Sequence, residues 1–282
     1  MLLKDKQLKN LTTFKIGGKA KYYFLVESKE DAIYAFKFAK KNKIKKFILG
    51  NGSNILFDDR GFSGLVIHNK INFLKIDQGY VYVGAGFFLS SLSKKTSGIN
   101  LSGLEFGYSI PASVGGAVYM NASSFGQTIS DTLVSIDYLT SLGKIITIDK
   151  KDIKFGYRYS GFQKKRGMIL ACKFKLNLDK NAKINKEKFF QKKCLCQPLE
   201  TKNAGCIFKN PNNLSAWQLI EKCGFKNYAI GGAKISAIHS NFIINQNNAT
   251  SKNVKDLIKL VKQKVKKQEN ILLKEEIKII EY

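Results

Sequence analysis

The sequence is poor in the residues that build metal centres and disulfide frameworks. It has only two histidines, His68 and His239, and they are far apart. The number of cysteines is odd and no pair has Cys-x-x-Cys spacing; the five are Cys172, Cys194, Cys196, Cys206 and Cys223. We therefore expect free thiols and no metal site.

Long apolar runs are also missing. No stretch is long enough to cross a bilayer, and the first ten residues, MLLKDKQLKN, are charged where a signal peptide would be apolar. The 282 residues, 44% of them hydrophobic, can still bury a large core, as two domains or as one domain with an appendage. These features predict a cytoplasmic globular protein with no membrane partner.

Negative charge is scarce as well, since 48 basic residues face 21 acidic ones and the net charge is +27. Nucleic-acid binding is one interpretation. However, only Arg60, Arg158 and Arg166 are arginines, which read bases and phosphates better than lysines do, and the lysines are spread along the whole chain. The pattern favours a solvated surface that attracts anionic small molecules over a nucleic-acid partner.

The first half of the chain alternates between strand and helix patterns. It opens with a strand at 21–26, a helix at 29–42 capped by Ser28, and a strand at 47–49. Further segments with such patterns are strands at 64–67, 80–83 and 168–178, a helix at 88–97, and two strands within 132–148.

The lysine-rich segment 179–193 is the best candidate for a domain boundary. We therefore expect a first domain over residues 1–180 and a second over residues 181–282. In the second, the patterns predict a short helix at 215–223, an amphipathic helix at 250–269 and a last strand at 276–282.

Residues Ser102–Gly126 depart most from the lysine-rich background. Their sequence is SGLEFGYSIPASVGGAVYMNASSFG, in which Glu105 is the only ionisable charge. Glycine lets the main chain approach a ligand closely, and successive N–H groups favour an anion such as pyrophosphate. The segment is therefore either a ligand cradle or a tight structural turn between two buried strands.

A second glycine-rich loop, Gly50–Asn54, follows the strand at 47–49, which is a common position for phosphate binding. The loop is not a P-loop, because no Gly-Lys-Ser/Thr follows it. Gly84-Ala85-Gly86 lacks a third glycine in register, so a Rossmann site is poorly supported. A nucleotide cofactor would need another fold.

Three further clusters combine small residues with reactive side chains. Arg158, in FGYRYS, suits either an anchored anion site or a structural salt bridge or cation–π contact. Cys206, in NAGCIFKNP, is either a proton donor or a small buried hydrophobic residue. His239, in GGAKISAIHSNF, is either a base or a hydrogen-bonded structural residue.

In their order along the chain, these motifs closely resemble the UDP-N-acetylenolpyruvoylglucosamine reductase (UDP-N-acetylmuramate dehydrogenase) family, flavoenzymes of peptidoglycan synthesis. The resemblance covers almost the whole chain and matches the shorter subclass, which lacks an extra loop with a substrate-covering tyrosine. It is carried by residues 10–18, 49–54, 103–126, 157–160, 204–211, 231–245 and 273–277.

The resemblance implies an α+β protein with an FAD-binding domain of the vanillyl-alcohol-oxidase (PCMH) type, followed by a smaller α+β substrate-binding domain. Two segments would hold the FAD pyrophosphate through main-chain N–H groups. The implied FAD-binding residues are Leu49, Gly50, Asn51, Gly52, Ser53, Asn54, Ser109, Ile110, Pro111, Ala112, Ser113, Gly115, Gly116 and Ala117.

The reaction implied by the resemblance uses NADPH to reduce the flavin, which then reduces UDP-N-acetylglucosamine enolpyruvate to UDP-N-acetylmuramate. Arg158 and Glu276 would stabilise an enol-like intermediate, and Cys206 would donate a proton. The implied substrate contacts are Tyr157, Lys209 and Asn210, and His239 receives no chemical role. The enzyme would be a cytoplasmic monomer that supports cell-wall biogenesis, cell shape and cell division.

The sequence departs from the family at three positions. Cys206 replaces the serine of well-known members, and Ala112 and Ser123 replace glycines. A thiol can still donate a proton, but it can be oxidised. Two other functions remain open: an oxidase of the same fold that uses oxygen, and a basic nucleic-acid-binding protein. No histidine lies near the FAD loops to form the covalent flavin link that would favour an oxidase.

Overall fold

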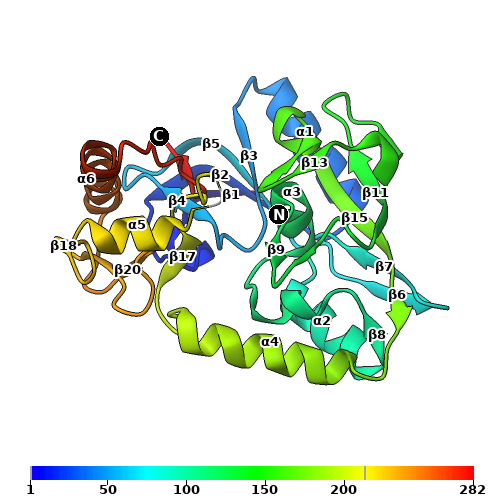
Figure 1. The fold of residues 1–282 in the computed structure, drawn as a ribbon. Helices are drawn as coiled ribbons and strands as arrows, with labels where there is room; N and C mark the ends of the chain where they lie inside the picture. Colours follow the sequence, from blue (N-terminus) through cyan, green and yellow to red (C-terminus); the bar gives the residue numbers. More distant parts are fainter. Residues whose placement is uncertain (1, 213) are drawn as a thin grey trace. The chain divides into compact units, whose positions relative to one another are not determined.

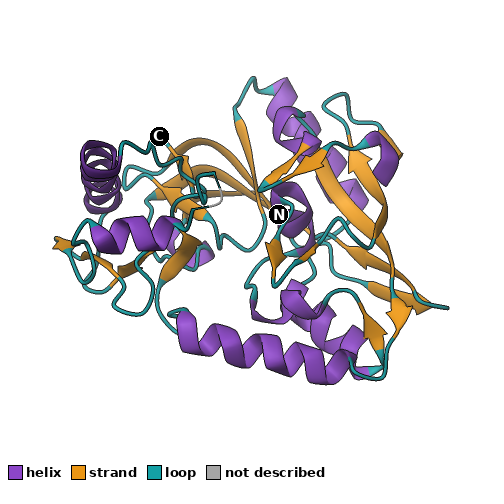
Figure 2. Cartoon of the chain, in the orientation of Figure 1, coloured by secondary structure: helices purple, strands orange, loops and turns teal. Residues whose placement is uncertain are grey.

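The computed structural model describes residues 2–212 and 214–282 (Figure 1). Helices and strands are both distributed along the chain, as in an α+β protein (Figure 2). The described residues form two compact units, each assembled from separate stretches. The first unit contains Tyr23–Asn51 and Gly64–Lys193, and the second contains Lys4–Tyr22, Gly52–Ser63 and Cys194–Tyr282.

The segment expected to separate two domains is a helix, α4 (Ala182–Cys196). It forms because its aromatic residues have partners: Phe189 stacks on Phe125 with ring centroids 4.7 Å apart, and Phe190 meets Tyr108 edge to face. The second unit resumes near the end of this helix. The division of function between residues 1–180 and 181–282 stays a prediction, and Met1 lies outside the described residues.

The first unit is built on a five-stranded antiparallel sheet with the order β12-β11-β15-β7-β6. Side chains of the inner strands and of two helices form one core, which includes Val81, Val83, Leu92, Ile136 and Phe174. The elements are β6 (Leu74–Asp77), β7 (Tyr80–Gly84), α2 (Leu89–Gly98), α3 (Val114–Met120), β11 (Leu133–Leu139), β12 (Ile145–Asp149) and β15 (Met168–Lys175).

The N-terminal elements confirm the predicted strand, helix and strand. They are β1 (Leu2–Gln7), β2 (Lys19–Val26), α1 (Lys29–Lys41), β3 (Lys46–Leu49) and β5 (Phe62–Asn69), with the sheet order β1-β2-β5-β3. Ser28 begins α1 with a capping box, in which its hydroxyl accepts from Asp31 N–H and the Asp31 carboxylate accepts from Ser28 N–H. Strand β1 has no counterpart among the predicted elements.

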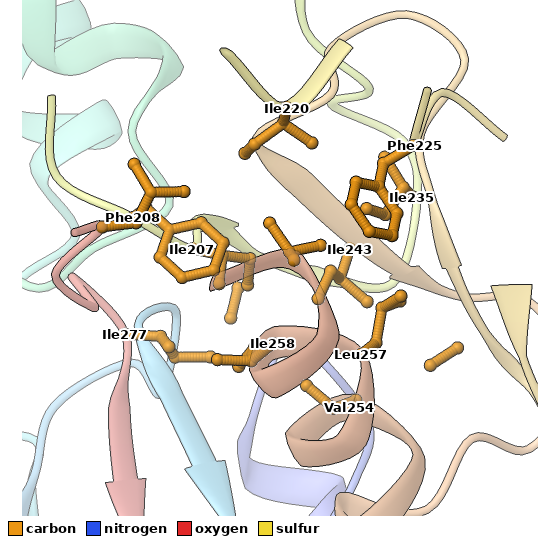
Figure 3. Close-up of a cluster of buried hydrophobic side chains, with 14 of the residues drawn as sticks. Ile207, Phe208, Ile220, Phe225, Ile235, Ile243, Val254, Leu257, Ile258 and Ile277 are labelled. Carbon is orange, nitrogen blue, oxygen red and sulfur yellow. The ribbon is translucent and has the colours of Figure 1, made fainter. Parts of the chain in front are cut away.

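The second unit has a four-stranded antiparallel sheet with the order β17-β20-β19-β18. The amphipathic stripe of α6 packs into its core, as predicted, and Figure 3 shows Val254, Leu257 and Ile258 among the other buried side chains. The elements are β4 (Ile55–Phe57), β17 (Asn203–Cys206), α5 (Ala216–Lys222), β18 (Ala229–Ile230), β19 (Ala233–Ile235), β20 (Phe242–Asn245), α6 (Ser251–Glu269) and β21 (Lys278–Ile280).

Strand β21 is shorter than the predicted 276–282 and pairs in parallel with β4. Among the described residues, no helix is both long and apolar enough to cross a membrane. The remaining elements are β8 (Leu101–Ser102), β9 (Ser123–Ser124), β10 (Gln127–Thr128), β13 (Phe155–Gly156), β14 (Tyr159–Ser160), β16 (Asn177–Leu178), and the 3-10 helices Lys9–Leu11, Glu105–Ser109, Lys150–Asp152 and Gly161–Lys164.

Candidate active site

In the first unit, the loop after β3 meets the segment that leads into α3. The Asn51 side-chain amide donates to the Pro111 carbonyl. A Cβ on Gly50 would lie 2.4 Å from the Ser113 hydroxyl oxygen, so a larger residue would displace that hydroxyl or the backbone around it. Two segments that the sequence assigns to one cofactor are therefore in contact. Leu49 is buried at the end of β3, so only its main chain can take part.

The glycine-rich stretch is not a tight turn between two buried strands, because it folds into a 3-10 helix and then α3. The N–H groups of Val114 and Gly115 donate to the carbonyls of Phe87 and Ala85 at 2.9 and 2.8 Å. A Cβ on Gly115 would lie 2.8 Å from the Ala85 Cβ. Gly115 thus serves helix packing, and its N–H is already bonded within the protein.

The start of this segment, in contrast, can receive a ligand. Pro111 is exposed, and Ile110 and Ala112 are partly exposed. The Ser109 hydroxyl is buried and has no hydrogen-bond partner in the part of the chain that the structure describes. A buried hydroxyl without a partner is costly unless a ligand supplies one. Uncharged main chain and this hydroxyl fit a bound cofactor such as FAD.

Arg158 lies in the two-residue turn between β13 and β14. Its φ of +52° is in the left-handed region, which is uncommon for residues other than glycine. The turn is fixed to the end of α3: Ser160 Oγ donates to the Tyr119 carbonyl at 2.7 Å, and Asn121 Nδ2 donates to the Gly156 carbonyl at 3.0 Å. Gln163 Nε2 donates to the carbonyl of Arg158 itself.

The Arg158 guanidinium contacts a serine and a tyrosine of the same unit. Its Nη1 donates to the hydroxyl of Ser123, and it lies over the Tyr157 ring at 5.1 Å from the centroid. The cation–π contact that the sequence left open is therefore present. The ring of Tyr157 is half exposed. The sequence analysis did not predict the Ser123 contact, and its one signal is a serine where the resemblance leads us to expect glycine.

In the second unit, Cys206 ends β17 beside an irregularity in its pairing with β20. Gly205 makes this possible with φ +74°, while the Asn203 side-chain oxygen accepts its N–H at 2.8 Å. Cys206 is partly exposed, whereas Cys172 and Cys223 are buried. Unlike those two, the Cys206 thiol has the access that a proton donor needs.

Glu276 lies beside the same strand end. Its N–H donates to the Ile207 carbonyl at 2.7 Å, and its own carbonyl accepts from Asn54 Nδ2 at 3.2 Å. Figure 3 shows the buried neighbours Ile207 and Ile277 in the core beneath this segment. The structure thus gathers Asn54, Cys206 and Glu276 around one backbone connection. Gly52 and Ser53 precede Asn54 in the same unit.

Lys209 and Asn210, two of the predicted substrate contacts, follow shortly after Cys206 along the chain. Lys209 N–H donates to the Lys274 carbonyl at 2.9 Å, and the Asn210 side-chain oxygen accepts from Ala216 N–H at 3.0 Å. Asn210 therefore also anchors the start of α5. Asn241, which the sequence did not single out, holds the strand end in place by bonding both Phe208 N–H and its carbonyl.

His239 fits the structural alternative. Its Nδ1 accepts from Asn241 N–H at 3.3 Å, and its ring lies near Trp217 and Phe242. Burial lowers the pKa of the imidazole below its ordinary value. His239 is therefore a packed structural residue, linked through Asn241 to Phe208.

Comparisons with known proteins give one consistent match. Residues 20–149 match the family described as FAD binding domain, and residues 197–280 match UDP-N-acetylenolpyruvoylglucosamine reductase, C-terminal domain. The chain is 44% identical to the UDP-N-acetylenolpyruvoylglucosamine reductase of Protochlamydia amoebophila over 98% of this chain and 92% of that protein. It is 42% identical to the enzyme of Chlamydia felis over 98% and 93% of the two chains.

A solved structure agrees. The UDP-N-acetylenolpyruvylglucosamine reductase of Thermus caldophilus superposes with a TM-score of 0.84 and 31% sequence identity. The similarity covers 99% of this chain and 98% of that one. Both the fold and the full length of the chain are therefore shared with this enzyme.

Proposed function

This chain belongs to the UDP-N-acetylenolpyruvoylglucosamine reductase family, and from this premise we infer its function. It is an FAD-dependent oxidoreductase that uses NADPH to reduce UDP-N-acetylglucosamine enolpyruvate to UDP-N-acetylmuramate. This reaction supplies peptidoglycan synthesis, and through it cell-wall biogenesis, cell shape and cell division. The fold is an FAD-binding domain of the vanillyl-alcohol-oxidase type with a reductase-specific C-terminal domain.

FAD would be held by the two uncharged segments at residues 49–54 and 109–117. The close approach of Gly50 to Ser113 supports this assignment, as does the buried Ser109 hydroxyl, which has no partner among the described residues. The N–H groups of Ile110, Val114, Gly115 and Ala117 already donate within the protein, and Pro111 has no N–H. Phosphate contacts from this segment would therefore come from Ser109, Ala112 and Ser113, together with the 50–54 loop. When bound, FAD takes up hydride from NADPH and supplies it to the enolpyruvyl double bond.

The chain's own residues would stabilise the negative charge on the substrate and donate the proton. As hydride adds to one carbon of the double bond, negative charge develops on the substrate carboxylate. The Arg158 guanidinium would stabilise that charge, with Glu276 supporting the same intermediate. Cys206 would complete the reduction by passing its proton to the neighbouring carbon.

The observation that best supports these roles is the hydrogen bond from Glu276 N–H to the carbonyl of Ile207. This bond brings Glu276, near the end of the chain, next to Ile207, which directly follows Cys206 in the sequence. Lys209 and Asn210, on the same strand end, would contact the UDP group, and Tyr157 would contact the substrate beside Arg158. The net charge of +27 would attract this anionic substrate.

We expect the enzyme to act in the cytoplasm as a monomer. The decisive experiment is the absorbance spectrum of the purified protein. A yellow flavin spectrum should bleach with NADPH and recover when UDP-N-acetylglucosamine enolpyruvate is added without oxygen. Recovery that requires oxygen and yields peroxide would indicate an oxidase, and a colourless protein with salt-sensitive DNA affinity would indicate a nucleic-acid-binding protein.

A further inference from the structure

The turn that carries Arg158 fixes the backbone of this residue, but a backbone cannot fix a long side chain. The main chain is held by Gln163 and by the neighbouring contacts to Tyr119 and Asn121. The guanidinium extends from a two-residue turn whose other member, Tyr157, is half exposed. A group that must meet a carboxylate in one geometry needs an anchor beyond its own strand.

Ser123 provides that anchor, since its hydroxyl accepts from Nη1 of Arg158. A hydroxyl is a neutral acceptor, so it orients the guanidinium without cancelling its positive charge as a carboxylate would. A guanidinium has five N–H donors in a planar fork, so a hydrogen bond at one end also sets the direction of the other end. A glycine, which is the residue the family resemblance predicts here, has no side chain to make this bond.

The position of Ser123 is itself well defined. Ser123 pairs with Thr128 across the β9–β10 hairpin. The Thr128 hydroxyl donates to the Asp131 carboxylate at 2.7 Å, and the same carboxylate accepts Thr128 N–H at 2.7 Å. These bonds tether the strand opposite Ser123 to the next turn of the chain.

The other pair of the hairpin is tethered too. Gln127, which pairs with Ser124, bonds through its side-chain amide to the buried Glu105 carboxylate and accepts from Phe106 N–H, each at 3.4 Å. The Glu105 carboxylate also accepts Gly103 N–H at 2.8 Å. Both residues that face Ser123 and Ser124 in the hairpin are therefore hydrogen-bonded to other parts of the unit, which holds the Ser123 hydroxyl in place.

We propose that Ser123 is a positioning residue of this enzyme: it holds the Arg158 guanidinium ready for the carboxylate of the enolpyruvyl substrate. The inference rests on the proposed role of Arg158 and extends it to a residue specific to this chain. Without the hydroxyl, the guanidinium samples more orientations, so substrate affinity and the rate of substrate reduction both fall while the fold is kept.

The test compares Ser123→Ala, Ser123→Gly and Ser123→Thr with Ser124→Ala, the neighbour in the same short strand. Binding of UDP-N-acetylglucosamine enolpyruvate to the oxidised holoenzyme is measured by calorimetry, and kcat and KM for its reduction are measured separately. Ser123→Ala and Ser123→Gly should weaken binding by roughly 10-fold, the effect of losing one hydrogen bond to a charged group. Ser123→Thr, which keeps a hydroxyl, and Ser124→Ala should bind as the wild type does.

The combination with Arg158→Ala separates positioning from a general structural effect. If Ser123 acts through Arg158, adding Ser123→Ala to Arg158→Ala should cause no further loss of substrate affinity. The thermal unfolding midpoint of the single variant Ser123→Ala should match that of the wild type. An equal loss in both backgrounds, or wild-type affinity in Ser123→Ala, would overturn the inference while leaving Arg158 in its role. Normal substrate reduction by Arg158→Ala would instead remove the role of Arg158 and the inference with it.

Discussion

The main-chain N–H of Glu276 lies 2.7 Å from the carbonyl oxygen of Ile207. This hydrogen bond joins the last segment of the chain to the end of β17 and places a carboxylate-bearing residue beside the one that follows Cys206. Asn54 adds a third segment by donating to the carbonyl of Glu276. The Glu276 main chain therefore joins three motifs that are far apart in the sequence.

The Cys206 thiol should be replaceable by another proton donor of similar size, but not by a methyl group. Cys206→Ser should keep turnover of the enolpyruvyl substrate. Cys206→Ala should lose turnover and still oxidise NADPH slowly, because only the protonation of the substrate is blocked. Parallel assays of NADPH oxidation and UDP-N-acetylmuramate formation check this. Normal product formation by the alanine variant would exclude Cys206 as the donor.

Arg158→Lys should be severely impaired although it keeps the charge. The ammonium is a compact point charge and does not replace the planar fork of the guanidinium. We expect substrate reduction to fall by roughly 100-fold, as when one donor to a developing oxyanion is removed. Arg166→Lys, at an exposed position of the same unit, is the matched control and should be unaffected. Near-normal reduction in Arg158→Lys would take Arg158 out of the mechanism.

Gly50→Ala should weaken FAD binding. Its Cβ would lie 2.4 Å from the Ser113 hydroxyl oxygen, so either that hydroxyl leaves its capping position on α3 or the two FAD segments separate. Titration of the apoprotein with FAD, followed by fluorescence, measures the loss. Gly98→Ala, where a Cβ would meet nothing within 4 Å, is the control.

The double variant Gly50→Ala/Ser113→Ala sharpens this prediction because it removes the clashing hydroxyl. It should bind FAD more tightly than Gly50→Ala does, although loss of the Ser113 cap on α3 costs about 1 kcal/mol of stability. Equal FAD affinities in the single and double variants would show that the clash with the Ser113 hydroxyl does not cause the loss of FAD affinity.

Asp58→Asn should destabilise the second unit at neutral pH. The buried Asp58 carboxylate accepts from Arg60 and, at 2.9 Å, from Lys255 Nζ, and these bonds hold its pKa well below the usual range. Removing the charge should lower the free energy of unfolding by about 2 kcal/mol at pH 7. Asp256→Asn, which breaks an exposed pair with Lys252 on the same helix, should have little effect.

The pH dependence of this difference has a defined sign. Because the folded pKa is depressed, the stability contributed by Asp58 is complete above the unfolded pKa of about 3.9 and is lost as pH falls toward the folded pKa. The difference in the free energy of unfolding between wild type and Asp58→Asn should therefore be constant from pH 6 to about pH 5 and shrink below about pH 4. Urea denaturation across this range measures it, and a gap that grows on acidification would contradict the assignment.

Much of the local structure could be predicted because local chemistry dictates it. Ser28 followed by Asp31 begins α1, and the apolar stripe of α6 is buried as its period requires. Elements without such signals were missed. Strand β1 is charged and largely at the surface. Helix α4 has the composition of a linker, and its phenylalanines pack on Phe125 and Tyr108, which are distant in sequence.

The family can be recognised without a structure, because ordered motifs over nearly the whole chain identify an FAD-dependent reductase with Cys206, Arg158 and Glu276 as its candidate groups. The folded chain is needed to show which glycines pack against protein and which distant residues are bonded to each other. Gly115 packs on Ala85, Ser123 accepts from Arg158, and Glu276 bonds Ile207. These contacts join segments that are far apart in the sequence. Residue type and spacing along the chain do not show which of those segments lie close together in space.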